Sequence, residues 1–277
     1  MTLGQAAILG VVEGLTEFLP VSSTGHLILA AHAMGLVGAV MDSFEIVIQA
    51  GALLAVVWLY RERVGELFAG LVRPHPRGRA LLLKLFVAFL PAAFVGLATH
   101  HWIKEHLFGP HPVTAALIVG GVAILVVERL RRQEAGAGSV TSVDDLTVRA
   151  AFWIGVAQCL SLWPGTSRSM VTILAALLLG ATPVVAAEFS FLLALPTLGA
   201  ATMFDLVKSY RDLTAPELGG PWPLAVGLLV SAIVAALAIK SFLGYLTRRG
   251  LAPFGWYRIA FGAALLVFFL LHGGTAA

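Results

Sequence analysis

Long apolar runs separated by short polar connections recur from one end of the chain to the other. A transmembrane α-helix needs about 20 predominantly apolar residues. The hydrophobic pattern predicts six such spans, near Phe44–Tyr60, Leu81–Ala98, Val113–Glu128, Val184–Val207, Leu224–Leu246 and Phe254–Leu271. Because helices satisfy all of their backbone hydrogen bonds internally, the fold class is an all-α polytopic membrane protein.

Two further apolar regions break in the middle at a polar turn. Residues 1–36 turn near Pro20 and residues 146–181 turn near Pro164, and the apolar pieces on either side are too short to span a bilayer. Irregular backbone at membrane depth is tolerated only where protein buries it or where it lines a cavity. We therefore expect two re-entrant helical hairpins.

The two broken regions also resemble each other. ILGVVEGLTEFLPVSSTGH can be laid over WIGVAQCLSLWPGTSRSM, and a one-residue gap then matches Ser23 with Ser167. Each hairpin is followed by three predicted spans, so we interpret the chain as one membrane domain of two repeats, about 1–133 and 146–277. Because three is an odd number, the second repeat is expected to be inverted, an arrangement that builds polar sites at the membrane midplane.

Composition agrees with a membrane protein. Of 277 residues, 59% are hydrophobic and only 12% are charged, whereas ordinary soluble domains carry about 25% charged residues. The single cysteine excludes an internal disulfide. The net charge of +3 does not indicate nucleic-acid binding, since the basic residues cluster in particular loops.

These loop residues predict the orientation through the positive-inside rule. One side of the membrane would receive Arg61, Arg63, Arg73, Arg77, Arg79, Arg129, Arg131, Arg132, Arg149, Arg248, Arg249 and Arg258. The other side would receive mainly Lys104, Lys208 and Arg211. The first side is then cytoplasmic, and both termini face outward. An outer loop would contain four histidines, interpreted as solvated: His100, His101, His106 and His111.

The first hairpin carries two carboxylates in the segment EGLTEFLPVSSTGH. Glu13 and Glu17 are four residues apart and share one helix face. Charges at membrane depth are costly and normally line a functional cavity. Two carboxylates on one face can hold a divalent cation, or one of them can act as a base. A structural pair tied to partner helices is the alternative.

Hydroxyl groups follow these carboxylates. The turn after Pro20 consists of Val21, Ser22, Ser23, Thr24, Gly25 and His26. Ser and Thr are favoured N-caps, and a helix N-terminus surrounded by hydroxyls is an anion site. His26 is a candidate acid, base or nucleophile. Simple capping and a structural histidine are the alternatives.

The second hairpin places Arg168 within an apolar stretch. An always-charged guanidinium at a helix start can bind a phosphate through its two parallel N–H donors, an arrangement we call a phosphate fork. The alternative is an arginine whose side chain snorkels to the membrane interface. The groups that would join it at a phosphate are Gly165, Thr166, Ser167, Ser169 and Thr172. If the hairpins are inverted, their tips meet and would hold a phosphate, together with a metal ion, against a lipid-facing wall. This pattern indicates phosphoryl chemistry on a lipid.

Two motifs, E-x-x-x-E at Glu13/Glu17 and P-G-x-S-R-S-x-x-T at Pro164–Thr172, resemble the paired signature of the undecaprenyl-pyrophosphate phosphatase family, also called bacitracin-resistance proteins. The similarity extends along the chain, including FEIVIQ and EFSFLLALP. It implies an enzyme of the bacterial cytoplasmic (inner) membrane that hydrolyses undecaprenyl pyrophosphate to undecaprenyl phosphate and inorganic phosphate. That reaction recycles the lipid carrier for cell-wall synthesis and confers bacitracin resistance. The resemblance also implies a divalent cation, Mg²⁺ or Ca²⁺, and a site open to the outer, periplasmic face.

The expected catalytic residues are Glu13, Glu17, Ser23, His26 and Arg168. A metal held by the two glutamates would act with Arg168 to neutralise the pyrophosphate oxygens. Ser23 or a water would attack the terminal phosphorus, and His26 would handle the proton or be the nucleophile itself. The nucleophile, the metal and the oligomeric state stay open, a homodimer included.

Two other functions are weighed against this one. A polyprenyl-phosphate flippase would use the same midplane site. A lipid phosphatase of the phosphatidic-acid type would need a histidine after its Ser-Arg pair, and Met170–Leu179 contains none.

Overall fold

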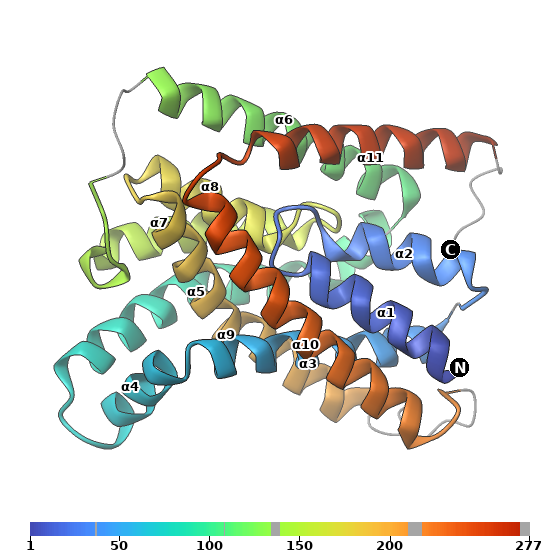
Figure 1. The fold of residues 1–277 in the computed structure, drawn as a ribbon, viewed down its shortest axis with the longest axis horizontal. Helices are drawn as coiled ribbons and strands as arrows, with labels where there is room; N and C mark the ends of the chain where they lie inside the picture. The colour runs from blue at the N-terminus through green and yellow to red at the C-terminus, as the bar shows by residue number, and fades with distance from the viewer. Residues whose placement is uncertain (37, 108, 134–138, 210–217, 272–277) are drawn as a thin grey trace.

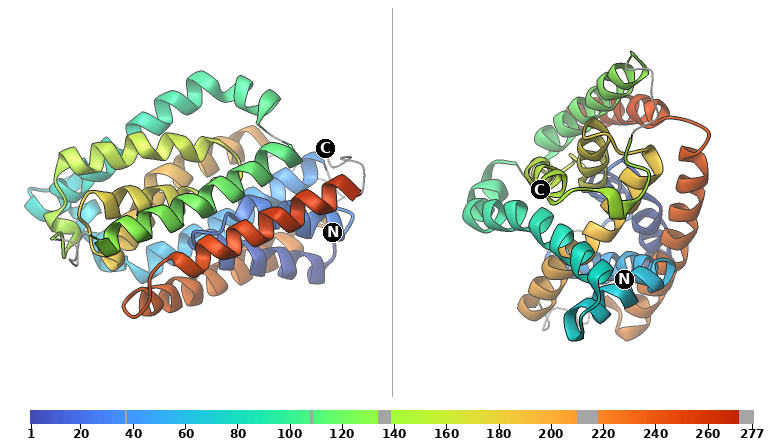
Figure 2. Two further views of the ribbon diagram at one scale, coloured as in Figure 1. Left: turned by 90° about the horizontal axis from the view of Figure 1, so that it is seen from above. Right: turned by 90° about the vertical axis from the view of Figure 1, so that its left-hand side faces the viewer.

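The computed structural model describes residues 1–36, 38–107, 109–133, 139–209 and 218–271. Within these ranges the regular structure is helical, apart from one isolated bridge between Val140 and Ala181. The elements, in chain order, are α1 (Leu3–Thr16), α2 (Ser23–Ala33), α3 (Ala39–Leu59), α4 (Arg61–Val72), α5 (Pro76–His106), α6 (Pro110–Gln133), η1 (Val143–Asp145), α7 (Val148–Gln158), η2 (Cys159–Leu162), α8 (Arg168–Leu178), α9 (Pro183–Ser209), α10 (Pro221–Leu246) and α11 (Ala252–Leu271). Figures 1 and 2 show their arrangement.

Among the described residues, five helices are long and apolar enough to cross a membrane. The spanning parts are Pro76–Thr99, His111–Arg131, Pro183–Val207, Pro221–Leu246 and Ala252–Leu271. They correspond to the last five of the six predicted spans, so the prediction of a multi-pass helical membrane protein is confirmed. Figure 2 shows α6 and α11 running alongside each other.

The first predicted span, Phe44–Tyr60, falls on α3, which is followed directly by α4. Residues Phe44–Leu59 of α3 and Arg61–Val72 of α4 meet at 87°, and only together are they long and apolar enough to cross a membrane. No helix was predicted at α4. Its Arg63 contacts Glu66 at 3.0 Å and Asp144 at 3.1 Å. The mean hydropathy of a helix that carries several charged side chains is low, so hydropathy alone does not distinguish such a helix from a polar loop.

The predicted outer loop of histidines was also wrong. Helix α5 continues to His106, and α6 begins at Pro110. His100, His101 and His106 therefore lie on the last turns of α5, and His111 lies on the first turn of α6. Within the part of the chain that the structure describes, no three His, Cys, Asp or Glu residues are placed to hold a metal ion.

The two broken regions form pairs of short helices, as predicted. Helices α1 and α2 pack against each other on either side of the turn at 17–22, and α7 and α8 do so on either side of the turn at 163–167. Helix α1 lies against α10 (Figure 1), where Gly14 permits close approach. A Cβ at Gly14 would lie 2.5 Å from the Ser231 carbonyl oxygen and 2.8 Å from the Ala235 nitrogen. The first hairpin is thus held tightly against a long helix.

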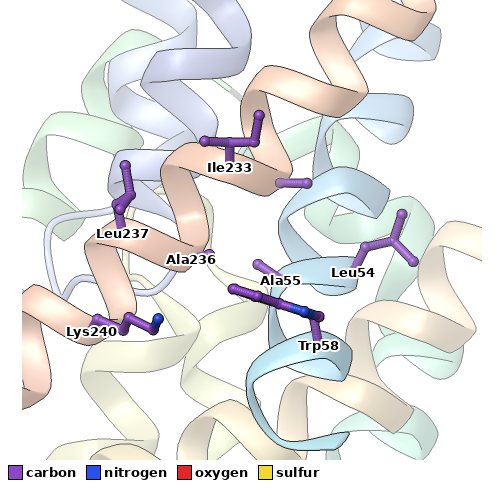
Figure 3. A pocket seen from close by; sticks show the side chains of 8 residues that line it. Leu54, Ala55, Trp58, Ile233, Ala236, Leu237 and Lys240 are labelled. Carbon is purple, nitrogen blue, oxygen red and sulfur yellow. The ribbon is translucent and has the colours of Figure 1, made fainter.

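An apolar groove lies between α3 and α10, on the outside of the helix bundle (Figure 3). Leu54, Trp58, Ile233 and Leu237 contribute to its lining and are at least half exposed, as expected for side chains that face lipid. The Lys240 amine lies 5.2 Å from the centre of the Trp58 ring. None of the candidate site residues lines this groove.

Candidate active site

The site is built on two matched turns. Ser22 precedes α2 with φ 73° and ψ 103°, and Ser167 precedes α8 with φ 72° and ψ 111°. They are the only non-glycine residues of the described chain with positive φ. Such backbone is costly and persists where the surrounding structure imposes it, often at functional sites. Each hairpin therefore turns sharply into the N-terminus of its second helix.

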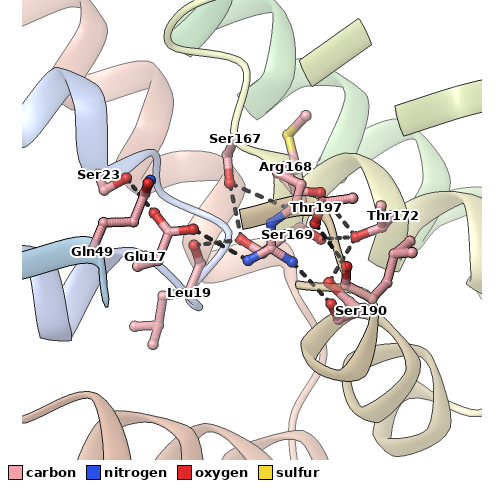
Figure 4. A network of polar contacts seen from close by, with 12 residues as sticks. Glu17, Leu19, Ser23, Gln49, Ser167, Arg168, Ser169, Thr172, Ser190 and Thr197 are labelled. Carbon is pink, nitrogen blue, oxygen red and sulfur yellow. Dashed lines mark hydrogen bonds and ion pairs between the residues drawn. The ribbon is translucent and has the colours of Figure 1, made fainter. Parts of the chain in front are cut away.

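A buried ion pair joins the two hairpins (Figure 4). Nη2 of Arg168 lies 3.2 Å from Oε1 of Glu17, with the two side chains 9% and 7% exposed. The other carboxylate oxygen of Glu17 accepts a 2.7 Å hydrogen bond from the Ser23 hydroxyl. One carboxylate therefore connects a candidate nucleophile to the candidate phosphate fork, and the hairpin tips meet as expected.

One nitrogen of the Arg168 guanidinium, Nε, makes no hydrogen bond to the described residues. Its Nη1 donates to the Ser190 carbonyl at 2.9 Å, and its Cζ lies 5.7 Å from the centre of the Phe18 ring. Its Nε is buried and has no hydrogen-bond partner among the described residues. A buried donor without a partner is costly, so this edge of the guanidinium suits an incoming phosphate oxygen.

The hydroxyls of the second hairpin hold Arg168 in place. Ser169 donates to the Leu19 carbonyl at 3.0 Å, and Thr172 shares a 2.7 Å hydrogen bond with the Ser190 hydroxyl. Ser169 and Thr172 are both fully buried. Because their hydrogen bonds are made within the protein, these two hydroxyls are placed to position the arginine. The half-buried Ser167 instead caps α8, since its hydroxyl accepts a 3.3 Å hydrogen bond from the Met170 N–H.

Glu13 supplies a second buried carboxylate. It is 1% exposed, and its Oε2 has no hydrogen-bond partner among the described residues. The charges that act on it are those of Glu17, Glu45 and Arg168, so negative charge is in excess. A buried carboxylate oxygen without a partner is costly, and oxygen ligands of this kind suit Mg²⁺ or Ca²⁺. The residues present therefore fit a divalent cation whose remaining ligands come from substrate oxygens or water.

His26 faces away from this network. Its Nδ1 lies 2.7 Å from the Ser22 carbonyl oxygen, and its Nε2 lies 2.7 Å from the Tyr257 hydroxyl. Because a carbonyl only accepts, Nδ1 carries the proton, and in the neutral ring Nε2 accepts from Tyr257. The ring stacks on Phe261 with centroids 4.2 Å apart. Nδ1 is thus engaged by the first hairpin turn and Nε2 by α11, and Ser23 is the candidate nucleophile that contacts Glu17.

The remaining candidates shape the turns. Gly165 and Thr166 direct their carbonyls to Arg258. Gly25 packs closely on α6, since a Cβ there would lie 3.2 Å from Leu117. Ser22 is buried, whereas Thr24 is half-exposed beside the start of α2.

Sequence reasoning missed four residues of this region, namely Phe18, Ser190, Tyr257 and Arg258. Arg258 was counted only among the arginines that predict the orientation, whereas its side chain is fully buried between the turns. Its position six residues inside an apolar helix was the signal that could have found it. Of the residues expected on the opposite side, Arg211 lies outside the described residues.

Buried carboxylates, a hydroxyl and a guanidinium meet between two broken-helix hairpins. The fold and the site together define a multi-pass helical membrane protein with a buried polar centre between its hairpins. The chain belongs to the bacitracin resistance protein BacA family, whose sequence profile matches residues 6–264.

Relatives in this family are similar over nearly their whole length. The undecaprenyl-diphosphatase of Sorangium cellulosum is 58% identical over 263 residues, covering 95% of this chain and 85% of the relative. That of Rhizorhabdus wittichii is 48% identical over 270 residues, covering 98% of each. That of Caldanaerobacter subterraneus is 46% identical over 263 residues, covering 95% of this chain and 94% of the relative.

Proposed function

We propose that this protein is an undecaprenyl-diphosphatase of the bacterial inner membrane. It hydrolyses undecaprenyl pyrophosphate to undecaprenyl phosphate and inorganic phosphate, which recycles the lipid carrier for cell-wall synthesis. Family membership and the names of the relatives support this function. The structural observation that carries it is Glu17, which contacts both the Ser23 hydroxyl and the Arg168 guanidinium.

In the proposed reaction, the Ser23 oxygen attacks the terminal phosphorus of the substrate. An O–P bond to Ser23 forms while the bond from the bridging oxygen to that phosphorus breaks, and undecaprenyl phosphate leaves with the bonding electrons. Glu17 accepts the Ser23 proton across their 2.7 Å hydrogen bond. Glu17 passes this proton to the departing undecaprenyl phosphate and becomes a carboxylate again. It then accepts a proton from the water that attacks the phosphoserine, and that proton goes to the Ser23 oxygen as the O–P bond breaks and inorganic phosphate is released.

Arg168 and the helix ends stabilise the charge that develops in this reaction. The free Nε edge of Arg168 faces phosphate oxygens in the proposed complex. The first turn of α2 has no side-chain cap, so its N–H groups are available to an anion. These groups are fixed before substrate binds, which makes them effective in a site from which water is excluded.

A divalent cation, Mg²⁺ or Ca²⁺, is proposed as the cofactor. Glu13 would be its main ligand, because one of its oxygens has no partner, and Glu17 would share it. When bound, the cation supplies Lewis-acid stabilisation of the pyrophosphate oxygens.

We further infer an inverted repeat and the predicted orientation. The repeat is supported by the nearly equal torsion angles of Ser22 and Ser167, which favour pairing these two serines rather than Ser23 with Ser167. The orientation is supported by Figure 1, where the arginine-rich α4–α5 and α10–α11 connections lie at one end. The N-terminus and the end of α11 lie toward the other end. The termini and the site would then face the periplasm.

Phosphate release tests the proposed function. Detergent-purified protein is given undecaprenyl or farnesyl pyrophosphate with Mg²⁺, Ca²⁺ or EDTA. We expect release that requires the metal and that disappears in Glu17→Ala. No release from a well-folded sample would contradict the phosphatase proposal, and flipping in vesicles would then be measured.

A further inference from the structure

Arg258 on α11 is fully buried, and all of its nitrogens donate to main-chain carbonyls. Nε donates to Leu117 (3.3 Å), Nη1 to Pro20 (3.3 Å), and Nη2 to Ala116 (3.1 Å), Gly165 (3.0 Å) and Thr166 (3.1 Å). The acceptors belong to three separate places: helix α6, the first hairpin turn and the second hairpin turn. One planar group therefore binds both turns to the same helix.

The two turns that Arg258 joins carry the reacting groups. Pro20 lies midway between Glu17 and Ser23, and Gly165 and Thr166 immediately precede the Ser167–Arg168 step. A shift of either turn would change the distance between Ser23 and the Arg168 guanidinium. A guanidinium presents five N–H donors in a rigid plane, whereas a lysine ammonium has three donors on one nitrogen at the end of a flexible chain. Of the two, only arginine can therefore hydrogen-bond these five carbonyls at once.

The charge of Arg258 also needs an explanation. Among the described residues no carboxylate forms an ion pair with it, and its five hydrogen-bond acceptors are all main-chain carbonyls. Burying an unpaired charge is costly, and an apolar side chain of similar volume is often at least as stable. The neighbouring helix makes room for it, since a Cβ at Gly120 would lie 2.9 Å from Cζ of Arg258. A cation behind the turns also adds positive potential where an anion binds.

We propose that Arg258 is a positioning residue for the phosphatase reaction, holding the two hairpin turns in register so that Ser23 and Glu17 face Arg168. The proposal rests on the proposed function. Arg258 does not touch the substrate; it acts through the backbone of both turns. Misplacement of reacting groups by about 1 Å can cost about 100-fold in rate.

The first test compares Arg258→Met with Leu265→Ala. Leu265 is a buried residue of the same helix, in an apolar cluster with Val113, Leu117 and Phe269, and its aliphatic side chain cannot hydrogen-bond the turns. We expect Arg258→Met to lower kcat at least about 100-fold while KM changes less than about threefold. Leu265→Ala is expected to lower the unfolding temperature in detergent and to keep kcat per folded enzyme within about threefold of wild type.

The second test leaves Arg258 in place. Gly120→Ala puts a methyl group against Nη2 and Cζ of Arg258, and also 2.9 Å from Sδ of Met170 on α8, so it crowds the guanidinium, although alanine favours the helix itself. We expect kcat to fall at least about tenfold, and the effect of Gly120→Ala to vanish in the Arg258→Met background. If Arg258→Met does not fold, the kcat of Gly120→Ala alone tests the positioning role of Arg258.

The outcomes separate the two proposals. Variants of Arg258 and Gly120 that fold and turn over like wild type would overturn the positioning role while leaving the phosphatase function intact. A folded wild type that releases no phosphate would overturn the proposed function and the positioning role with it.

Discussion

At the scale of single residues, Glu17 is the centre of the site. Its two oxygens contact Arg168 and Ser23, and it is almost completely buried. A buried ion pair often adds little net stability, because both charges lose their hydration. We interpret this pair as retained for its geometry, since it aligns a hydroxyl, a base and a guanidinium from two hairpins.

Removing the Ser23 hydroxyl tests the nucleophile. We expect Ser23→Ala to lower kcat by about 10³ or more, because the covalent step loses its attacking oxygen. Thr16→Val is the matched control: its hydroxyl lies on the same hairpin but donates to the Val12 carbonyl of its own helix at 2.7 Å. The measurement is phosphate release per folded enzyme. Near wild-type turnover by Ser23→Ala would exclude Ser23 as the nucleophile.

Glu13 tests the cation. Glu13→Gln removes the charge of the carboxylate whose Oε2 has no partner, so we expect Mn²⁺ to bind at least about tenfold more weakly. Binding is measured with the metal alone, by calorimetry or by Mn²⁺ spin resonance, and independently of activity. Glu62→Gln, on the exposed face of α4, is the control and should bind like wild type. Equal affinity of Glu13→Gln and wild type would exclude Glu13 as a ligand.

At the scale of elements, close helix contacts position the hairpins. Helix α1 meets α10 where Gly10 and Gly14 face backbone atoms, and α8 is buried along nearly its whole length. Small residues allow such approaches in membranes, where packing rather than water drives association. Helix α8 is further held by the Thr172–Ser190 hydrogen bond to α9. The turns can therefore keep strained backbone because the helices on both sides are fixed.

A methyl group at Gly14 should break the first of these contacts. In Gly14→Ala the added Cβ would lie 2.5 Å from the Ser231 carbonyl oxygen, and backbone cannot give way as a side chain can. We expect overpacking of about 1–3 kcal/mol and a lower unfolding temperature in detergent. Gly244→Ala on α10 has no atom within 4 Å of its new methyl and should not lower that temperature. Equal unfolding temperatures for the two variants would contradict the close packing of α1 on α10.

At the scale of the whole molecule, the arrangement separates a lipid-facing surface from a polar interior. Apolar side chains such as Leu97, Trp222 and Leu271 are highly exposed, as suits contact with lipid. The polar network lies between the hairpins, enclosed by the long helices. In the proposed reaction the prenyl chain lies in the membrane while its pyrophosphate binds in this interior.

Cysteine labelling tests the proposed orientation. In a protein whose Cys159 is replaced by alanine, single cysteines are introduced as Thr2→Cys, His111→Cys or Arg77→Cys, all at exposed positions. We expect a membrane-impermeant maleimide to label the first two in cells with a permeabilised outer membrane, and Arg77→Cys only after lysis. The opposite pattern would reverse the orientation.

Several features follow from the sequence by itself. The helical membrane class, the two broken regions and the polar residues at their turns are local properties, because span length and turn chemistry depend on neighbouring residues. Glu13, Glu17, Ser23 and Arg168 were selected on this basis. The amphipathic α4 was missed, because hydropathy averaged along the chain does not distinguish a helix with one charged face from a loop.

Only the tertiary structure decided how these residues meet. Glu17 and Arg168 are 151 positions apart, and the contact of His26 with Tyr257 spans 231 positions. Contacts at such separations depend on how whole helices pack, and a single sequence carries no local signal of them. The same holds for Arg258: the sequence placed it in the last predicted span and on the arginine-rich side, and only the packing of α11 on α6 buries it behind both turns.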